Sequence, residues 1–574
     1  MDIRKEIENL IHSALKKLDI SLPEVILEYP AEISHGDFAT NVALIAAKQA
    51  KKNPREFAEQ IRAQILENKP DFLEKIEVAG PGFINFFLSR EFLSENVALI
   101  LKSGEKFGQN KSLKGEEVLV EYTDPNPFKE FHIGHLMSNA IGESIARLYG
   151  NSGADVKRMC YQGDVGSHVA KTIWALIHED GALVKFRGLK SSVEKVKLLG
   201  EMYAIGSSHD NQPSIQTEIT DINKKVFDKS DKKINEIYKE GRQYSLDYFN
   251  TIYVLLGTKF DYNFFESEVY EEGEKIVQEF LKKGVFEKSE NAVVFHAEKY
   301  DKKLHTRVFI TSQGLPTYET KELGLIEKKF KKIKPDLSIT VTANEQSEYF
   351  KVVLKAVEII FPKIKDKIEH ISHGMMRFAD GKMSSRTGNV ITGVSLIADM
   401  EKMVGNKIKD REFDEETREK VSRRVAVAAI KYSILRQGIA GDIIFDADKS
   451  ISFEGDSGPY LQYSVVRANS VIEKAKKEGL KPSVKNPDET ATTLERKLAR
   501  FPEVAARALS ERAPHHVATY LTDLASEFNS YYATTKIADK ENIHSSFRLA
   551  LTQSFAVVMK NGLNLLGIEV PEKM

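Results

Sequence analysis

The sequence has a single cysteine and lacks a long apolar run. Cys160 is the one cysteine among 574 residues, so a single chain forms no internal disulfide and offers no cysteine cluster for zinc or an iron–sulfur centre. We interpret Cys160 as a buried structural thiol and expect a reducing, cytoplasmic location. The longest apolar stretches, such as residues 425–430, are far shorter than the ~18 residues of a membrane helix, so we expect no membrane partner.

An excess of charge of either sign is also missing. The chain has 83 Lys and Arg residues against 84 Asp and Glu residues, which gives a formal net charge of −1. Any contact with a polyanion therefore depends on local patches and not on an overall field. With 17 Pro, 34 Gly and 41% hydrophobic residues, the composition excludes a collagen-like or disordered chain. At this length we expect roughly three to five domains.

The first part of the chain has α/β patterning. Residues 1–112 predict a small α/β domain with a leading helix, a helix over residues 39–51, and a hairpin that turns at the Gly-Pro-Gly of residues 80–82. From residue 118 the order is strand (118–122), helix (133–149) and strand (154–162). This spacing predicts a parallel, Rossmann-like sheet. We place this second domain at residues 113–400.

The second domain is interrupted, and the chain after it is helical. A charged, mostly helical insertion is expected at about residues 180–300, and VVFHA, RVFITS, LSITVTA and IEHISHGMM are expected to form strands of the domain's second half. Residues 401–452 predict a helical connector, and residues 453–574 an all-α domain. Pro514 is near a helix start in that domain, and four apolar residues share the face of the helix: Val517, Leu521, Leu524 and Phe528. The predicted fold class is multidomain α/β with an all-α C-terminal domain.

The segment PNPFKEFHIGH, residues 125–135, follows the first strand of the predicted sheet. Ligands of parallel sheets bind at the carboxyl ends of strands, and the N-terminus of the next helix offers free N–H groups to phosphate. His132 and His135 can donate hydrogen bonds to phosphate oxygens, and Gly134 leaves room for an adenine ring. This pattern favours a nucleotide site over a helix that begins by chance with two surface histidines.

The segment GKMSSRTGN, residues 381–389, is a second candidate for phosphate contacts. A mobile loop with Lys382, Ser384, Ser385 and Arg386 can close over β- and γ-phosphates and stabilise departing pyrophosphate. Taken alone, the segment is more typical of a basic, solvated hairpin.

Together the two segments resemble the HIGH and KMSKS signatures of class I aminoacyl-tRNA synthetases, and the whole chain resembles the arginyl-tRNA synthetase family. GDFATNVALIAAK and GPGFINFF are similar to the family's N-terminal domain, GDVG and GLPTY to its catalytic domain, and FEGDSGPYLQYSVVR and NGLNLLGIEVPEKM to its anticodon-binding domain. The resemblance implies an arginine–tRNA ligase that makes arginyl-adenylate from arginine and ATP and then transfers arginine to tRNA(Arg). It also implies that tRNA must be bound before arginine is activated.

The resemblance assigns ATP, as its complex with Mg²⁺, to residues of both motifs. The family often lacks the second KMSKS lysine, where Ser385 stands here, and a lysine upstream of HIGH replaces it. The implied catalytic residues are Lys129, His132, Gly134, His135 and Lys382. The implied ATP-binding residues are Phe131, His132, Gly134, His135, Lys382, Ser384 and Ser385. No spacing of His or Cys predicts a metal ion held by the protein itself.

A planar guanidinium with five donors needs carboxylates and coplanar acceptors. The resemblance implies that arginine is bound by Glu121, Asp124, Asn126, Asp164, Tyr318, Glu322 and Gln346. Of these, Asp124 and Asn126 would hold the α-amino end. Relatives often carry Asp where Glu322 stands, and the additional methylene shifts the carboxylate by more than ~1 Å. Asp164 and His168 follow the second strand, so both should face the same cleft.

Aromatic side chains are candidates for tRNA contacts because unpaired bases stack on aromatic rings. The resemblance implies tRNA contacts for Phe83, Asn85, Tyr460, Tyr463, Tyr531 and Met574. The tyrosines suit a helical core equally well. The segment KKFKKIK, residues 328–334, can contact phosphates or form a solvated helix face.

Two alternatives remain open at this stage. A class I synthetase for lysine or glutamine would share the nucleotide motifs, but a lysine site needs only point charges, whereas paired carboxylates beside Tyr318 suit a guanidinium. A tRNA-binding protein without catalysis would not need the histidines and lysines of the two motifs. We expect a monomer whose partners are tRNA(Arg), arginine and ATP.

Overall fold

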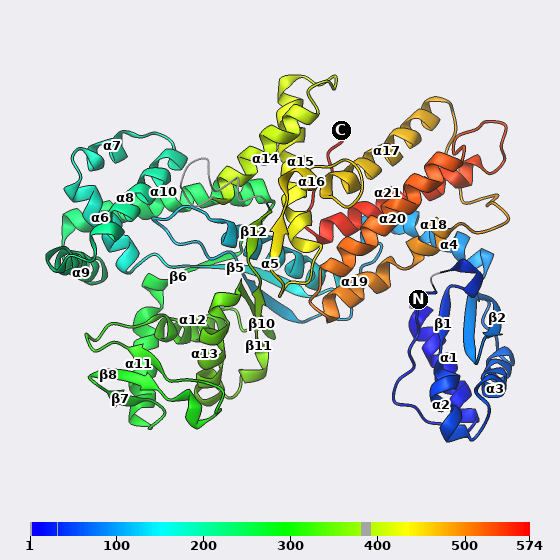
Figure 1. Ribbon diagram of the computed structural model, residues 1–574, viewed down its shortest axis with the longest axis horizontal. Helices are drawn as coiled ribbons and strands as arrows, with labels where there is room; N and C mark the ends of the chain where they lie inside the picture. The colour runs from blue at the N-terminus through cyan, green and yellow to red at the C-terminus, as the bar shows by residue number, and fades with distance from the viewer. Residues whose placement is uncertain (1–2, 31, 380–391) are drawn as a thin grey trace.

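A five-stranded parallel sheet lies near the middle of the molecule (Figure 1). The computed structural model describes residues 3–30, 32–379 and 392–574. The strands follow the order β11-β10-β4-β5-β6. They are β4 (Glu117–Glu121), β5 (Asp155–Gln162), β6 (Tyr262–Phe265), β10 (Leu337–Ala343) and β11 (Ile368–His373). The chain leaves β4 toward β5 on one side, and β10 lies on the other, so the switch point of the sheet is between β4 and β10.

The predicted strand, helix and strand at the start of this sheet are confirmed. The apolar core of β4, Val118 to Val120, is fully buried, as expected where helices cover both faces of a parallel sheet. Helix α5 (Ile133–Asn151) then crosses to β5, and almost its entire length is buried. Because α5 begins at the carboxyl end of β4, its N-terminus opens at the switch point.

A helical segment follows β5 and ends earlier than the sequence suggested. It consists of α6 (Ser167–His178), α7 (Ala182–Gly188), α8 (Ser192–His209), α9 (Pro213–Asp228) and α10 (Lys232–Leu256), which form one end of the molecule in Figure 1. The expected insertion extended to about residue 300. Instead, β6 returns to the parallel sheet, where it pairs with β5.

The strands expected at VVFHA and RVFITS do not belong to the parallel sheet, which corrects the prediction. β8 (Ala292–Phe295) and β9 (Arg307–Ile310) join β7 (Glu287–Ser289) in a separate antiparallel sheet. Glu290 and Asn291 both have positive φ, and a two-residue loop of this kind closes a tight hairpin. This sheet shares its own core with α11 (Tyr270–Lys282), α12 (Tyr318–Lys332) and α13 (Ser347–Ile360).

The N-terminal segment forms a small α/β unit with its own core. It contains α1 (Ile3–Lys17), α2 (Val42–Ala50), α3 (Pro54–Leu66) and an antiparallel sheet of β1 (Phe38–Thr40), β3 (Phe83–Leu88) and β2 (Leu73–Ala79). The predicted hairpin is confirmed. The predicted helix at residue 39 begins three residues later because residues 38–40 pair with β3. Helix α4 (Arg90–Ser103) leads out of the unit.

Helices dominate the chain after residue 392. They are α14 (Gly393–Lys407), α15 (Glu415–Leu435), α16 (Ala447–Ser450), α17 (Gly458–Lys477), α18 (Thr493–Ala499), α19 (Phe501–Ser510), α20 (His515–Thr534) and α21 (Ser545–Leu565). The predicted apolar face of α20, residues 517–528, is fully buried. One strand was missed: β13 (Ile443–Phe445) pairs with β12 (Met376–Phe378). Three residues are too few to show the alternation that identifies a strand.

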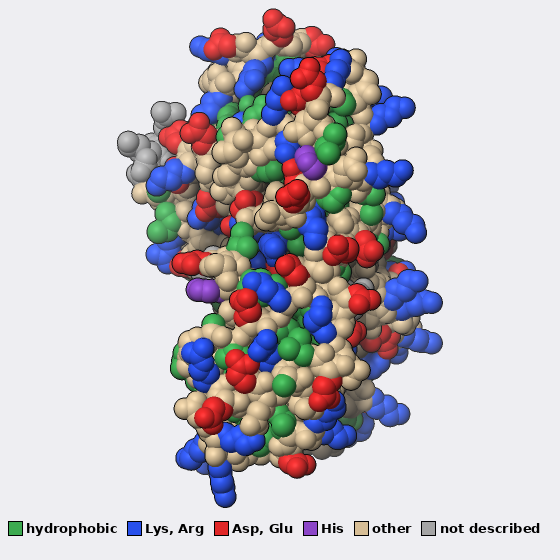
Figure 2. All heavy atoms as spheres, turned by 90° about the vertical axis from the view of Figure 1, so that its right-hand side faces the viewer, with side chains coloured by type: hydrophobic (Ala, Val, Ile, Leu, Met, Phe, Trp, Pro, Cys, Tyr) green, Lys and Arg blue, Asp and Glu red, His purple; other side chains and the backbone are tan. Residues whose placement is uncertain are grey.

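The N-terminal unit and α4 contact the C-terminal helices (Figure 1). Arg90 donates to Glu495 of α18 over 2.7 Å, and Arg496 forms an ion pair with Asp37. Figure 2 shows this side of the molecule, where basic and acidic side chains are interspersed over most of the face. Among the described residues, no helix is long and apolar enough to cross a membrane.

Candidate active site

The loop after β4 holds an unusual backbone conformation. Thr123, Asp124 and Phe128 have φ values of 82°, 46° and 68°, a region that non-glycine residues rarely adopt. Each such residue costs about 1–3 kcal/mol, and such strain clusters at functional sites. Helix α5 stabilises the loop: the Ser138 hydroxyl accepts from Thr123 N over 3.0 Å, and Asn139 donates to the Thr123 hydroxyl over 3.0 Å.

Two stacked histidines begin α5. His132 is the N-cap, and the ring centroids of His132 and His135 are 3.5 Å apart. The backbone N–H of His132 donates to Nδ1 of His135 over 3.1 Å, and the backbone N–H of His135 donates to Nδ1 of His132 over 3.4 Å. Both Nδ1 atoms are therefore acceptors. A neutral imidazole then carries its hydrogen on Nε2, so each ring keeps one N–H free to donate.

The two imidazoles are neutral near pH 7. Partial desolvation and the nearby Lys129 ammonium lower the pKa of His132 to about 4, and burial lowers the pKa of His135 well below its usual range. Neutral donors beside the free N–H groups of a helix N-terminus suit an anion whose charge grows during a reaction.

Gly134 stands between the two histidines in the sequence and has no side chain. A Cβ at this position would lie 3.0 Å from both Cε1 and Nδ1 of His132, closer than ordinary contact. The Lys129 ammonium lies 4.5 Å from the ring centroid of Tyr203 on α8. The helical segment after β5 thereby contributes a residue beside the histidines.

The chain after the second motif returns to the start of α5. Thr392 forms a bridge with His132, and Gly393 N donates to the carbonyl of Phe131 over 2.7 Å. The Phe131 side chain itself is fully buried and packs against His135. Lys382, Ser384 and Ser385, predicted to bind ATP, lie outside the described residues.

A buried cluster of charged side chains, which we name the acidic slot, lies at the end of β4 and against α12. Glu121 is the last residue of β4 and Glu322 is on α12; each is at most 5% exposed. Between them lies a buried ammonium, that of Lys329, which forms an ion pair with Glu121 and lies 3.9 Å from Glu322 Oε1. The sequence left two interpretations of KKFKKIK open, a phosphate contact and a solvated helix face. Neither of them applies to Lys329.

A second buried pair lies at the neighbouring strand end. Lys321 of α12 donates to Glu266 over 2.6 Å, and Glu266 directly follows β6 in a short 3₁₀ helix, η3 (Glu266–Glu268). Burial raises the pKa of Glu266 despite this partner. Sequence reasoning missed Glu266, Lys321 and Lys329, since none of them stands in a recognisable motif.

The slot contains more carboxyl groups than ammonium groups. Its four carboxylates, Glu121, Asp124, Glu266 and Glu322, face two ammonium groups, Lys321 and Lys329. Burial and the neighbouring carboxylates raise the pKa of Glu322 to about 7 and that of Asp124 well above its usual range. A cation that enters the slot favours the ionised carboxylates.

Further polar groups lie beside the slot. Asp124 accepts from Tyr161 N over 2.7 Å. A Cβ at Gly163 would overlap Oδ1 of Asn126 and lie 3.1 Å from Oε1 of Glu266, so Asn126 reaches the edge of the acidic cluster. Within the described chain, the buried Tyr161 hydroxyl has no hydrogen-bond partner. It is a further candidate that the sequence did not reveal.

Tyr318 and Gln346, also predicted to bind arginine, are both exposed. Tyr318 is the first residue of α12 and is 64% exposed, so core packing does not explain it. Its carbonyl accepts from the Tyr349 hydroxyl over 3.2 Å. Gln346 ends the 3₁₀ helix η5 (Asn344–Gln346), which follows β10, and is also exposed. Both side chains are therefore accessible to a ligand.

Asp164 is buried with its carboxylate already occupied by protein donors. It accepts from Arg242 Nε over 2.7 Å, from the Tyr238 hydroxyl, and from the backbone N–H and hydroxyl of Ser267. These partners belong to α10 and η3. His168 contacts the carbonyl of Gly163 over 3.0 Å through Nε2, and desolvation lowers its pKa to about 3.

The residues predicted to contact tRNA lie far apart. Phe83 is 38% exposed on β3, whereas Asn85 is buried within the same strand. In the C-terminal helices, Tyr531 and Met574 are buried, and the Tyr460 hydroxyl accepts from Asn529 over 2.9 Å. The structure therefore gives most of these side chains a packing or hydrogen-bonding role.

An aromatic and basic cluster is more accessible on the same helices. The Arg467 guanidinium lies 4.8 Å from the ring centroid of Tyr463 and 5.3 Å from that of Tyr532. Tyr532 is 43% exposed. Tyr463 thus lies in the kind of surface that can stack on a base.

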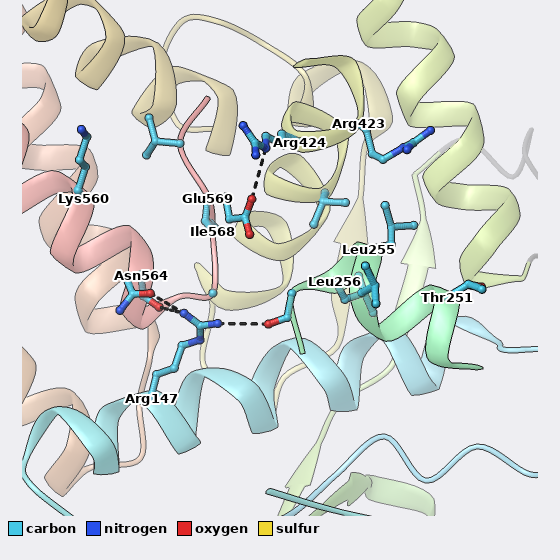
Figure 3. Close-up of a pocket in the computed structure, with 15 residues that line it drawn as sticks. Arg147, Thr251, Leu255, Leu256, Arg423, Arg424, Lys560, Asn564, Ile568 and Glu569 are labelled. Carbon is cyan, nitrogen blue, oxygen red and sulfur yellow. Dashed lines mark hydrogen bonds and ion pairs between the residues drawn. The ribbon is translucent and has the colours of Figure 1, made fainter. Parts of the chain in front are cut away.

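A hollow of about 670 Å³ lies at the other end of α5 (Figure 3). Arg147, in the C-terminal half of α5, donates to Asn564 of α21 over 2.5 Å, and Arg424 pairs with Glu569 over 3.3 Å. Because α5 rises ~1.5 Å per residue, this hollow is roughly 20 Å from the histidines and is not their ligand site. Among the described residues, no group of three His, Cys, Asp or Glu side chains could hold a metal ion.

Three family models match the chain. The model described as "tRNA synthetases class I (R), catalytic domain" matches residues 96–447. The model described as "DALR anticodon binding domain" matches residues 461–574, and "Arginyl tRNA synthetase N terminal domain" matches residues 5–88. Together these matches extend over nearly the whole chain.

Full-length relatives agree with these matches. Proteins named "Arginine--tRNA ligase" from Clostridium botulinum and Clostridium acetobutylicum are 31% and 30% identical, and each alignment covers 100% of both chains. The solved arginyl-tRNA synthetase of Thermus thermophilus has a TM-score of 0.79 at 24% identity, over 100% of both chains. That of Plasmodium falciparum has a TM-score of 0.80 at 20% identity, over 100% of this chain and 99% of that one. Both solved structures therefore have the same fold as this chain.

Proposed function

The chain belongs to the arginyl-tRNA synthetase family of class I, and from this premise we propose that the site at the switch point activates arginine with ATP and charges tRNA(Arg). The observation that supports arginine most directly is the buried acidic slot of Glu121 and Glu322, where Glu121 ends the strand that precedes the histidine-capped helix α5. A guanidinium is planar and always charged, and it can form two parallel hydrogen bonds to one carboxylate, such as that of Glu322, which an ammonium cannot.

In this proposal the start of α5 holds the phosphates of ATP. The Nε2–H groups of His132 and His135 point at the α-phosphate, and Lys129 supplies a point charge from the adjacent loop. Lys382, Ser384 and Ser385 are assigned to the β- and γ-phosphates from their motif alone. Mg²⁺ enters with ATP as part of the substrate. Phe131 contributes through its backbone and through packing against His135.

The first step is in-line attack of the arginine carboxylate on the α-phosphorus. A new bond forms between the carboxylate oxygen and phosphorus, and the bond to the β-phosphate breaks, so that pyrophosphate leaves. Positioning and charge stabilisation supply most of the acceleration. Asp124 and Asn126 hold the α-ammonium near the attacked atom, while Tyr318 and Gln346 border the side-chain end.

Asp164 acts in this proposal as a positioning residue. Its oxygens are already occupied by donors from α10 and η3, so it fixes the loop that carries Gly163 against Glu266. The second step is attack of a terminal ribose hydroxyl of tRNA on the activated carbonyl carbon, with AMP as the leaving group.

The domain roles follow the family. We assign residues 1–112 to tRNA binding, 113–400 to catalysis, 401–452 to a connector and 453–574 to the anticodon. Phe83, Tyr460 and Tyr463 are the proposed tRNA contacts with exposed or partly exposed rings, while Asn85, Tyr531 and Met574 shape those surfaces from within.

Exchange of labelled pyrophosphate into ATP tests the proposal. We expect exchange with arginine in the presence of tRNA, little exchange with lysine or glutamine, and loss of exchange in Glu322→Gln. Glu327→Gln, on the same helix but paired at the surface with Lys331, is the matched control. Exchange with lysine as fast as with arginine would refute the assignment of the slot, and equal exchange without tRNA would refute the tRNA requirement.

A further inference from the structure

Lys329 is buried inside the slot that, in the proposed function, receives the arginine side chain. It lies seven residues after Glu322 on α12, so the two side chains share one face of the helix. Only 2% of the Lys329 side chain is exposed. A lysine in a run of seven basic and apolar residues would ordinarily extend into solvent, so its burial needs a specific partner.

That partner is the carboxylate at the bottom of the slot. Lys329 forms an ion pair with Glu121 and lies 3.9 Å from Glu322, whose nearest buried cation it is. Lys321, the other buried ammonium of α12, is bonded to Glu266 at the neighbouring strand end. Of the three glutamates in this cluster, Glu322 is the one that lacks an ammonium within hydrogen-bond distance.

We propose that Lys329 is a positioning residue of the arginine slot: its ammonium fixes the Glu121 carboxylate and leaves Glu322 as the carboxylate that meets the guanidinium. This inference rests on the proposed function. Without the Lys329 charge, two carboxylates would share one buried space, and one of them would take up a proton instead of binding a cation. Lys329 itself need not touch the substrate.

The charges around the slot come from every element packed against it. The charged groups are those of Glu121 of β4, Asp124 of the following loop, Glu266 of η3, and Lys321 and Glu322 of α12. Two titratable hydroxyls, those of Tyr161 of β5 and Tyr349 of α13, lie nearby. Removing the Lys329 cation from this set makes ionisation of the remaining carboxylates harder. Arginine binding should then require a higher pH.

Three variants of α12 test the role of Lys329 in charging of tRNA. Lys329→Met should raise the KM for arginine about ten-fold or more and leave the KM for ATP within about two-fold. Lys329→Arg keeps the cation and should regain most of the affinity. Lys331→Met is the matched control because Lys331 is exposed on the same helix and pairs with Glu272 and Glu327. The pH midpoint of arginine binding should rise in Lys329→Met alone.

A purely structural lysine predicts different results. An unchanged arginine KM in Lys329→Met, an equal rise of the KM values for arginine and ATP, or a Lys329→Arg variant no better than Lys329→Met would overturn the inference. Should Lys329→Met fail to fold, Glu121→Gln tests the same pair, because it leaves the Lys329 ammonium free to pair with Glu322, 3.9 Å away. The inference expects this variant to bind tRNA normally with a raised arginine KM, and a wild-type arginine KM would overturn it.

The same assay separates this inference from the proposed function. A wild-type protein that charges no tRNA with arginine refutes the proposed function. Wild-type charging with unchanged kinetics in the Lys329 variants refutes only the role of Lys329.

Discussion

The imidazole rings of His132 and His135 stack with their centroids 3.5 Å apart, and each Nδ1 accepts the backbone N–H of the other residue. This reciprocal cap has two consequences. It satisfies two of the N–H groups left free at the start of α5, and it fixes both rings in the tautomer that presents Nε2–H to a ligand. Helix formation and phosphate binding therefore use opposite sides of the same two side chains.

His135→Ala and His132→Ala should each slow adenylate formation about a hundred- to a thousand-fold, because each removes one donor to the reacting phosphate. Affinity for tRNA should be unchanged. Pyrophosphate exchange and a tRNA-binding titration measure the two effects. His178→Ala, which removes a ring stacked on Trp174 at the end of α6, is the control and should keep normal exchange. Normal exchange in His135→Ala would contradict the phosphate assignment.

Gly134→Ala should weaken ATP binding by displacing a catalytic ring. The added Cβ would lie 3.0 Å from two atoms of His132, so the ring must turn and its Nε2–H must move. We expect the KM for ATP to rise about ten-fold, which corresponds to about 1.4 kcal/mol. Gly150→Ala, in the last turn of the same helix, would place its Cβ at an ordinary 3.9 Å from Cγ2 of Val156 and should be silent or slightly stabilising. Equal effects of the two substitutions would exclude this explanation.

Arginine affinity should rise with pH through about pH 7. The pKa of Glu322 is raised to about 7, so this carboxyl is protonated below that pH and carries the charge that a guanidinium needs above it. Binding at pH 7 should therefore release protons. Calorimetry in two buffers with different ionisation enthalpies measures that release. Glu322→Gln should bind weakly at every pH and flatten the profile, and an affinity constant from pH 6 to pH 8 in the wild type would show that the slot does not titrate.

Asp164→Asn should lower stability more than it changes substrate affinity. Asp164 is fully buried, and its pairing with Arg242 joins the loop after β5 to α10. Breaking a buried pair of this kind costs about 3 kcal/mol, which thermal unfolding would detect as a lower midpoint. Asp247→Asn, an exposed residue of α10 bonded to Gln243, is the control. A stable Asp164→Asn variant with a strongly raised arginine KM would instead place Asp164 in contact with arginine.

The sequence predicts those parts of the site whose signal is local. The apolar run of β4 and the glycine and histidines after it identify a strand end and a phosphate-binding helix start within about twenty residues. Glu121 and Glu322 followed from resemblance and not from local pattern. β8 and β9 were misassigned to the parallel sheet because their runs are as apolar as parallel strands, and only the left-handed turn at Glu290 and Asn291 distinguishes a hairpin. β7, the charged segment Glu287–Ser289, carries no strand signal and was missed.

Lys329 shows why the remaining residues of the site could not be predicted from the sequence. In the sequence it is one of several lysines on the last turns of a helix, a pattern typical of a solvated face. Its partner, Glu121, lies on a strand far away in the chain, and burial follows only once α12 packs against the end of β4. The same holds for Lys321 and Glu266. Buried ion pairs between distant segments are a tertiary property, so a single sequence does not reveal them.

Charging of unfractionated tRNA with labelled amino acids tests the central claim most directly. The account predicts that arginine is attached in the presence of ATP, and that lysine and glutamine, supplied at the same concentration, are not. Attachment of lysine at a comparable rate, or arginine charging that survives removal of the Glu121 and Glu322 carboxylates, would contradict it.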